Sequence, residues 1–234
     1  MRCANTPREI NRLPESSRVP LLLAAQVVEE QRKGAVVLDT RDAERFAQLH
    51  IRGAMQLGLV GPFASWAAML LEPDLDLVIV ADEEPHAEEA RLRLARVGLE
   101  RVIAYSLADE HRWREERISL ASIAIKRCAS LCQTLERDRS LQLVDVRSRA
   151  EWLQGHLPGA ISVPLLDLRS RMQLIDPTKP SLVYCHEGYR ATTAASILLQ
   201  QSSSDIGILI DGIEGWSASG LPLEVPTTVT PTGR

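Results

Sequence analysis

The sequence predicts an α/β protein of two tandem domains, each with a central parallel sheet and helices on both faces. Three observations support this prediction: an internal duplication, short apolar runs rich in Val and Ile, and helical segments that alternate with those runs. Runs such as LVIV and LVY are typical of parallel strands that are buried on both faces. Strands that alternate with helices are in turn typical of a parallel sheet covered by helices.

The duplication is clearest between residues 39–54 and 145–160, which align without a gap at a constant offset of 106. An apolar run precedes the first aspartate of both segments, and Phe46 aligns with Trp152. Six of the sixteen aligned positions are identical: Asp39 with Asp145, Arg41 with Arg147, Gln48 with Gln154, His50 with His156, Gly53 with Gly159 and Ala54 with Ala160. We interpret this similarity as a duplicated domain.

Each copy is expected to contain a strand, a variable loop, a second strand, a charged or catalytic loop, a helix and a last strand. In the first copy, residues 53–71 carry no charge, but Gly53, Gly58, Gly61 and Pro62 interrupt the first half of the stretch. A membrane-spanning helix needs about 20 predominantly apolar residues. The stretch therefore predicts a buried strand, a turn and a short helix, and no membrane span.

The two copies stay parallel farther along the chain. Asp82, after one apolar run, aligns with Cys185, and Trp113 aligns with Trp216, both at an offset of 103. The first copy therefore holds three additional residues in the intervening loop.

We expect the two domains to span residues 19–114 and 118–226. The charged run at residues 112–119 is interpreted as a solvated linker between them. Residues 2–19 and 226–234 are polar and rich in Pro, Thr and Ser, which predicts loose arms at both ends.

Composition excludes several classes of function. The chain has 234 residues, with 27 Lys and Arg, 31 Asp and Glu and a formal net charge of -4. This balance provides no basic surface for nucleic acid or for an anionic membrane. The four cysteines are too few and too irregularly spaced for a disulfide framework, which favours a reducing compartment. Charge and a proline in the first ten residues argue against a secretory signal, so a cytoplasmic location is expected.

The most informative segment is Leu182–Gln200, where an apolar strand delivers Cys185 to its carboxyl end. The next residues, His186, Glu187, Gly188 and Tyr189, form a loop, and Arg190 opens a helix. Ligands bind at this edge of open α/β sheets. Backbone N–H groups and the positive end of the helix dipole stabilise a thiolate or a bound anion there.

Two residues of this loop have specific expected uses. Gly188 permits the tight left-handed geometry that turns the amides inward. Arg190 adds a fixed positive charge that forks onto an oxyanion. A free cysteine usually behaves as a small buried hydrophobe, but the Cys-x-x-Gly-x-Arg spacing at a strand-to-helix turn favours catalysis by Cys185.

The other cysteines are interpreted without a chemical role. Cys128 and Cys132 are four residues apart on an expected helix, but no second ligand pair follows at the spacing of a zinc site. Core packing is therefore the favoured interpretation for this pair, and no metal site is predicted. Cys3 lies in the expected N-terminal arm.

Four motifs stand out in the second half of the chain: Cys185–Arg190, Asp145-Val146-Arg147, Gly155–Ala160 and Asp211–Trp216. Together they resemble the rhodanese (thiosulfate sulfurtransferase) family, and the resemblance covers roughly residues 19–225. It implies a tandem rhodanese whose active cysteine lies in the second domain. In that family a cysteine takes a sulfane sulfur from a donor, holds it as a persulfide and passes it to a thiophilic acceptor.

The resemblance also implies roles for individual residues. Cys185 is the nucleophile and sulfur carrier, and the amides of residues 186–190 cradle the persulfide. Arg190 orients the anionic donor, while Asp145 and Arg147 brace the loop from beneath. His186 is left open between proton transfer and a solvent-facing loop position. His156 and Trp216 are expected to be structural.

The same resemblance implies the partners. The donor is a small sulfur compound such as thiosulfate or a persulfide, and the acceptor is a thiol or cyanide, with a protein acceptor as a further option. No metal or organic cofactor is implied. The loop ends in Arg190, as in single-domain rhodaneses, and lacks the Val-Thr ending of two-domain enzymes. Thiosulfate as the natural donor is therefore left open, and mercaptopyruvate is disfavoured.

The first copy is expected to be inactive. It has Asp82 in the position of Cys185, followed by Glu83, Glu84, Pro85 and His86, and Ala87 in the position of Arg190. Acidic side chains there would repel anionic donors, so no sulfur chemistry is expected at that loop.

Two alternatives stay open. The first is a phosphatase-like or arsenate-reductase-like enzyme of the same fold, although its loops resemble Cys-x5-Arg, whereas four residues separate Cys185 from Arg190. The second is a non-catalytic binding module, against which Cys185 is the main argument.

Overall fold

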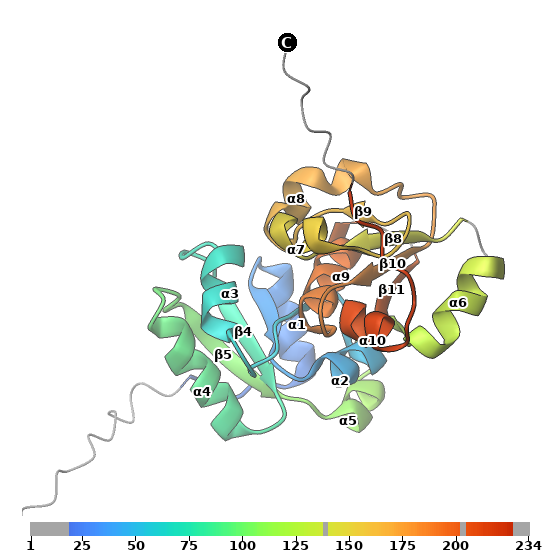
Figure 1. The fold of residues 1–234 in the computed structure, drawn as a ribbon. Coiled ribbons are helices and arrows are strands. Elements are labelled where there is room, and N and C mark those ends of the chain that lie inside the picture. Colours follow the sequence, from blue (N-terminus) through green and yellow to red (C-terminus); the bar gives the residue numbers. More distant parts are fainter. Residues whose placement is uncertain (1–18, 138–139, 202–204, 227–234) are drawn as a thin grey trace, which may run out of the picture.

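A computed structural model describes residues 19–137, 140–201 and 205–226, and Figure 1 shows their fold. Most of both predicted arms, together with Cys3, lies outside the described residues. The described chain forms two parallel sheets flanked by helices, which confirms the predicted fold class of two tandem α/β domains. No helix within the described ranges is long and apolar enough to cross a bilayer.

The first domain is built on a sheet of four parallel strands in the order β3-β1-β4-β5. The strands are β1 (Val36–Asp39), β3 (Met55–Gln56), β4 (Leu77–Ala81) and β5 (Val102–Leu107). The helices are α1 (Ala24–Arg32), α2 (Ala43–Gln48), α3 (Phe63–Leu70), α4 (Glu84–Ala95) and α5 (Glu110–Glu115). Every residue of β4 is buried, as expected for a central strand covered on both faces. The strand, turn and short helix predicted for residues 53–71 are confirmed as β3, a loop and α3.

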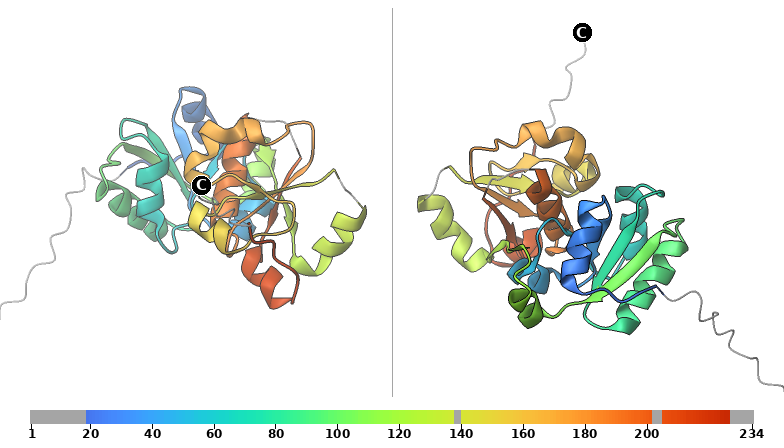
Figure 2. Two further views of the ribbon diagram at one scale, coloured as in Figure 1. Left: turned by 45° about the horizontal axis from the view of Figure 1, so that its top comes forward. Right: turned by 180° about the vertical axis from the view of Figure 1, so that it is seen from behind.

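The second domain has five parallel strands in the order β7-β11-β10-β8-β9. The strands are β7 (Ala124–Lys126), β8 (Gln142–Asp145), β9 (Ile161–Ser162), β10 (Ser181–Tyr184) and β11 (Ile206–Leu209). The helices are α6 (Cys128–Arg137), α7 (Arg149–Gln154), α8 (Leu168–Arg171), α9 (Tyr189–Gln201) and α10 (Gly212–Ala218), with short 3-10 turns at Leu165–Asp167 and Met172–Leu174. Figure 2 shows the two domains from two further sides, the first in blue to green and the second in yellow to red.

Both domains close in the same way. In the first, β2 (His50–Ile51) pairs antiparallel with β6 (Leu120–Ala121), which follows α5. In the second, His156 forms an antiparallel bridge with Glu224, beyond α10. The segment after the last helix of each domain therefore returns to the same place in its own repeat.

The predicted solvated linker at residues 112–119 is wrong for its first half, which belongs to a helix, while most residues of the run are exposed. Residues up to Glu115 belong to α5, and Trp113 is buried beneath the guanidinium of Arg41, 5.1 Å from its ring centroid. Ser119 then accepts a backbone hydrogen bond from Arg52 at 2.9 Å. The predicted domain start at residue 118 thus lies just before a segment that pairs with the first domain. One aromatic residue in a charged helix is enough to anchor it to the core.

The Asp-x-Arg and His positions shared by the repeats have a structural use in both. Arg41 and Arg147 each hold the aspartate two residues earlier and donate to a backbone carbonyl eight residues later. His50 stacks on Phe46 at 3.9 Å, and His156 stacks on Trp152 at 3.4 Å, between ring centroids. The duplicated motif therefore encodes a buried ion pair and a stacked histidine that fix the connection after α2 or α7.

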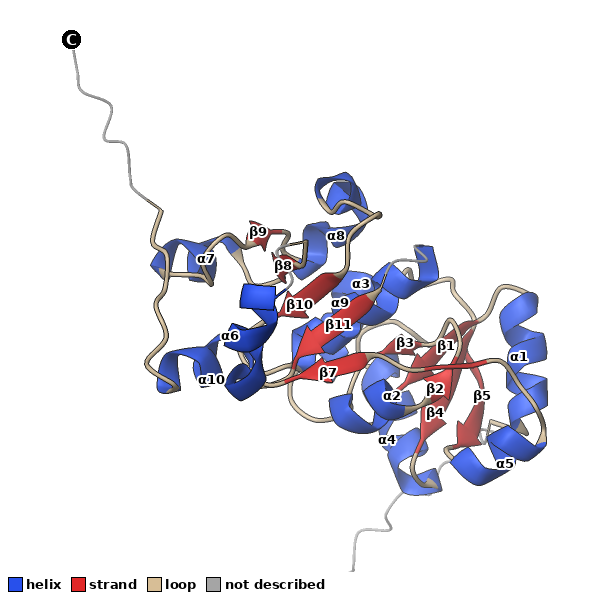
Figure 3. Ribbon diagram, turned by 90° about the vertical axis from the view of Figure 1, so that its right-hand side faces the viewer, coloured by secondary structure: helices blue, strands red, loops and turns tan. Residues whose placement is uncertain are grey.

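Helix α9 lies between the two domains. It contacts β10 and β11 of its own sheet and also β3 and α2 of the first domain, and Figure 3 shows it beside β3. Eight of its residues, 191–198, are buried in succession, which is typical of a helix covered on all sides. The helix that begins at the predicted catalytic loop is thus also the main helix of the domain interface.

Candidate active site

Cys185 directly follows β10, a central strand with β8 on one side and β11 on the other. The cysteine is 1% exposed, and its Sγ accepts a hydrogen bond from the backbone N–H of Gly188 at 3.2 Å. The predicted arrangement of a loop amide facing the cysteine sulfur is present at this residue. Such a contact stabilises negative charge on sulfur.

Two glycines explain why the loop closes over the sulfur. Gly188 has φ +87°, and a Cβ there would lie 2.6 Å from the carbonyl oxygen of Ile210. Gly212 has φ +58°, and a Cβ there would lie 2.0 Å from the carbonyl oxygen of His186. Both positions therefore need a residue without a Cβ, for conformation and for space.

The first turn of α10 holds the loop from behind. The backbone N–H of Ile213 donates to the carbonyl of Cys185 at 2.9 Å, and that of Glu214 donates to the carbonyl of His186 at 3.3 Å. The indole of Trp216 is buried and donates to the carbonyl of Pro222 at 2.9 Å. The glycine-tryptophan segment thus supports the loop through its backbone, a role that the sequence alone did not reveal for Gly212.

Arg190 is held by a residue that sequence reasoning missed. Its Nη1 and Nη2 donate to the two carboxylate oxygens of Glu151 at 2.8 and 2.7 Å. Glu151 also accepts from the backbone N–H and the hydroxyl of Ser148, the N-cap of α7. The hydrogen bonds from Arg190 hold the pKa of Glu151 at about 2, below its usual 4.5. The bond to Glu151 raises the pKa of Arg190, and the electrostatic interaction with nearby Cys185 raises it further.

The side chain of Tyr189 contacts the first domain. Its hydroxyl donates to the carbonyl of Gly58 at 2.9 Å. Burial raises the pKa of Tyr189 to about 12, so the phenol stays neutral. The predicted part of this residue in binding substrate through its backbone amide stays a prediction.

His186 and Glu187 are exposed at the mouth of the loop. Together with Glu214 they place three potential ligand atoms within 4.8 Å of one another. Exposed acidic groups often gather without a cation, so the cluster carries no metal assignment. The groove beside it has a volume of about 550 Å³ and is lined in part by Arg147, His186 and Glu214.

Arg147 lines this groove and holds Asp145. The Arg147 guanidinium contacts both oxygens of Asp145 and donates to the carbonyl of Gly155 at 2.7 Å. The guanidinium also lies 5.9 Å from the ring centroid of Tyr184, the residue immediately before Cys185. Among the described contacts the ion pair thus touches the strand before the loop and the turn after α7, and bracing of residues 185–190 stays a prediction.

The corresponding loop of the first domain has a different register from the predicted one. Asp39 pairs with Val80, and Asp145 pairs with Tyr184, so Ala81 rather than Asp82 takes the place of Cys185. Helix α4 then begins at Glu84, three residues after Ala81, whereas α9 begins four residues after Cys185. The first-domain loop is therefore one residue shorter, and it contains neither a cysteine nor an arginine.

The chain is similar to known proteins in both halves. The model of the Rhodanese-like domain matches residues 23–107 and 129–219. A sulfurtransferase of Allochromatium vinosum is 35% identical over 97 residues, which are 42% of this chain and 91% of that protein. Thiosulfate sulfurtransferase GlpE of Coxiella burnetii is 30% identical over 84 residues, 36% of this chain and 78% of that protein. The HTH-type transcriptional regulator Rv0324 of Mycobacterium tuberculosis is 27% identical over 123 residues, 52% of this chain and 50% of that protein.

Two solved structures match the chain at low TM-scores. A rhodanese-related protein from Thermoplasma volcanium has a TM-score of 0.41 and 24% identity, over 44% of this chain and 99% of that chain. Thiosulfate sulfurtransferase from Pseudomonas aeruginosa has a TM-score of 0.39 and 22% identity, over 90% of this chain and 44% of that chain.

Proposed function

The chain belongs to the Rhodanese-like domain family, and on that premise we propose that it is a sulfurtransferase that carries sulfane sulfur as a persulfide on Cys185. The observation that supports this proposal most directly is the hydrogen bond from the Gly188 amide to the Cys185 sulfur. Arg190 donates two hydrogen bonds to Glu151, and its positive charge lies close enough to Cys185 to interact with it electrostatically. Two relatives carry the name sulfurtransferase.

The proposed first step is a displacement at sulfur. The Cys185 thiolate attacks the outer sulfur of thiosulfate, the S–S bond of the donor breaks, and sulfite leaves with the bonding electron pair. The product is a Cys185 persulfide anion. Backbone amides of the loop, with Gly188 the first of them, stabilise this anion as they would any oxyanion or thiolate.

The second step regenerates the cysteine. A thiolate or cyanide attacks the terminal sulfur of the persulfide, the S–S bond to Cys185 breaks, and the electron pair returns to the Cys185 sulfur. The acceptor leaves as a persulfide or as thiocyanate. No external oxidant or reductant is needed, because the sulfane sulfur is only handed on. The acceptor class proposed here includes thiols of other proteins.

Intact-mass measurement after incubation with thiosulfate, or with another sulfane-sulfur donor, tests the proposal. The mass should rise by one sulfur atom, about 32 Da, and return on addition of cyanide. Cys185→Ser should abolish the adduct. Cys128→Ser is the matched control, because Cys128 is also buried and is the first residue of a helix, α6. Absence of an adduct with every donor would favour the non-catalytic binding module.

A further inference from the structure

One face of α9 carries a stripe of polar residues. Tyr189, Thr193, Ser196 and Gln200 follow one another at spacings of four, three and four residues, which places them on a single stripe. All four side chains hydrogen-bond to the first domain, and they contact one short stretch of it, residues 53–58. We call this stretch the α9 cradle.

Gln56 is the centre of the α9 cradle and is completely buried. Its side-chain oxygen accepts from the Thr193 hydroxyl at 3.1 Å, and its side-chain nitrogen donates to the carbonyl of Arg41 at 3.2 Å. Its backbone N–H donates to the Ser196 hydroxyl at 3.0 Å. Gln56 thus joins α9 to the first-domain sheet through both its backbone and its side chain.

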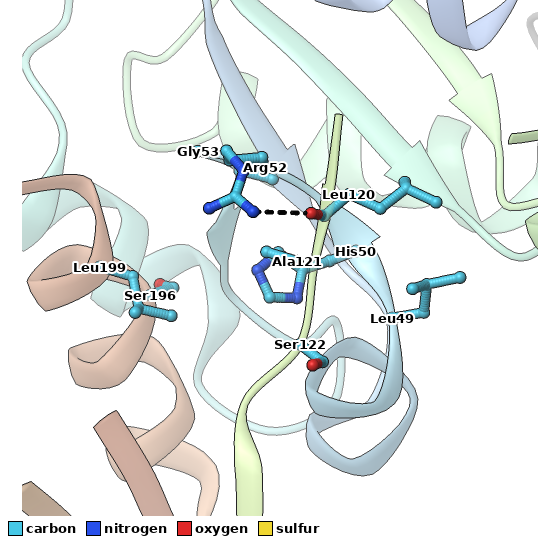
Figure 4. A pocket seen from close by; sticks show the side chains of 10 residues that line it. Leu49, His50, Arg52, Gly53, Leu120, Ala121, Ser122, Ser196 and Leu199 are labelled. Carbon is cyan, nitrogen blue, oxygen red and sulfur yellow. Dashed lines mark hydrogen bonds between the residues drawn. The ribbon is translucent and has the colours of Figure 1, made fainter. Parts of the chain in front are cut away.

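The two ends of the cradle hold the ends of the helix. The Tyr189 hydroxyl reaches Gly58, where an added Cβ would lie 3.3 Å from the tyrosine ring. At the far end, the Gln200 side chain donates to the carbonyl of Gly53 at 3.0 Å. Beside this end lies a cavity of about 500 Å³ between the domains, lined in part by His50, Gly53 and Ser196 (Figure 4).

The cradle is specific to the first domain. Because β3 is an edge strand of its sheet, the outward backbone N–H of Gln56 would have no hydrogen-bond partner without the Ser196 hydroxyl. At the offset of 106, the residue that corresponds to Gln56 in the second copy is Ser162, on the edge strand β9. The two copies therefore differ at this position, and Gln56 is the residue through which the first copy contacts α9 of the second.

A path of contacts leads from Gln56 to the cysteine. Within α9, Thr192 bonds to the carbonyl of Gly188 through both its backbone N–H and its hydroxyl, each at 3.0 Å. The N–H of Gly188 in turn donates to the Cys185 sulfur. A shift of α9 along or around its axis would therefore displace the amide that faces the sulfur.

We propose that Gln56 is a positioning residue that sets the rotation and axial position of α9, and through it the geometry of the Cys185–Arg190 loop. This inference rests on the sulfur-transfer function proposed above. Apolar packing is non-directional, so it allows small slips of a helix. Buried hydrogen bonds are directional, and a slip would leave their partners unsatisfied. In this interpretation the first domain takes part in catalysis by holding the helix that carries the active loop.

Gln56→Met tests the proposal, since it keeps the length of the side chain and removes its hydrogen bonds. The matched control is Gln142→Met, because Gln142 also bonds through both ends of its amide, to Asp176 and Ser181. Gln142 begins β8 and so lies at the amino ends of the strands, whereas the Cys185 loop follows the carboxyl end of β10. Thermal unfolding of both variants measures the structural part of the effect.

Three readouts distinguish positioning from stability alone. We expect Gln56→Met to lower kcat for sulfur transfer about tenfold to a hundredfold, with a smaller change in KM, as for a misplaced catalytic group. Amide hydrogen exchange of residues 185–190 should accelerate, and alkylation of Cys185 by iodoacetamide should change in rate. Gln142→Met should leave all three near the wild type.

The opposite result has a clear form. If Gln56→Met lowers the Tm but retains wild-type kcat, loop exchange and alkylation, Gln56 is structural only and the proposal is wrong. If Gln56→Met does not fold, Thr193→Val and Ser196→Ala each remove one bond of the same set and must give the same three changes. If the wild type accepts sulfur from no donor, the proposed function fails, while loop exchange and alkylation still decide the positioning role.

Discussion

Glu151 and Arg190 form a doubly hydrogen-bonded ion pair that joins α7 to the first turn of α9. The arginine side chain is 18% exposed and the carboxylate 32% exposed, so the pair lies at the rim of the site rather than in the core. The pair holds the charge of Arg190 beside the Cys185 loop in the absence of any donor.

The first domain contains an ion pair of the opposite polarity at a nearby place. Glu151 aligns with Arg45 at the offset of 106, and Arg45 hydrogen-bonds to Asp82 in the loop after β4. Asp82 does not correspond to Arg190, but each repeat ties its α2 or α7 helix to the segment after β4 or β10 by an ion pair. In the second repeat this segment carries the positive charge, and in the first it carries the negative charge.

The Glu151–Arg190 pair predicts a dependence of stability on pH. The pKa of Glu151 is about 2 in the folded protein and 4.5 without its partners. A carboxyl whose pKa is lower in the folded state contributes stability above the unfolded pKa and loses it as the pH falls through the folded value. At pH 7 we therefore expect Glu151→Gln to be less stable by about 1 kcal/mol, since the pair is partly exposed.

The difference should decline between about pH 4.5 and pH 2, as followed by urea unfolding of both proteins at several pH values. Glu29→Gln is the control, because it removes an exposed carboxylate that lies 3.5 Å from Arg32. A stability difference between wild type and Glu151→Gln that is constant from pH 7 to pH 2 would contradict this account.

Arg190→Ala should weaken the use of anionic donors more than it weakens the fold. The variant removes a charge at the rim of the site. We therefore expect kcat/KM for thiosulfate to fall, by an amount that corresponds to a loss of about 1.5 to 3 kcal/mol of transition-state stabilisation. Because the variant also leaves Glu151 without its partner, the double variant with Glu151→Gln separates the two effects. Arg171→Ala, in the same domain, is the control. An unchanged kcat/KM would remove Arg190 from the site.

The sequence was sufficient to predict most of the fold, because the features involved are local. The apolar runs that end near Asp82 and Cys185 became β4 and β10, and the constant offset of the duplication predicted two domains. The first half of the predicted linker is helical because Trp113 is buried against Arg41 and anchors the charged helix α5. The alignment of Trp113 with Trp216 already indicated a helix equivalent to α10.

The site residues that were missed depend on contacts between distant parts of the chain. Glu151 lies 39 residues from Arg190, and Gln56 lies 137 residues from Thr193. No spacing rule connects such pairs. The only signal in the sequence is that Glu151 aligns with Arg45, so the same helix position is charged in both copies. The register of Ala81 with Cys185 was also out of reach, because only the strand pairing shows that the loop is one residue shorter.

Installing a cysteine in the first domain should not restore sulfur transfer. In a Cys185→Ser background, neither Ala81→Cys nor Asp82→Cys should form a persulfide with thiosulfate. Ala81→Cys provides a thiol at the matching register, but the loop has no arginine, is one residue shorter and retains its glutamates. Asp82→Cys also removes the partner of Arg45. Intact mass after incubation with donor measures the outcome, and an adduct at the wild-type level in either variant would show that the first loop is competent.

Gly212 provides the sharpest test of how the loop is supported. Gly212→Ala would place a Cβ 2.0 Å from the carbonyl oxygen of His186 and 2.8 Å from that of Cys185, at a φ of +58°. Both oxygens are backbone atoms that accept hydrogen bonds from the first turn of α10, so they cannot move without breaking those bonds. We expect a loss of about 3 to 5 kcal/mol in unfolding free energy, as for other severe steric replacements.

Gly159→Ala separates the steric effect at Gly212 from the conformational one. Gly159 has a similar φ of +72°, but nothing lies within 4 Å of its added Cβ. A positive φ alone costs a residue with a side chain about 1 to 2 kcal/mol, so Gly159→Ala should lose only that much and retain sulfur transfer. Urea unfolding and persulfide formation, measured on both variants, check the pair. Equal losses of stability would mean that the positive φ accounts for the cost at both sites. The close approach of α10 to the Cys185 loop would then not explain why residue 212 must be glycine.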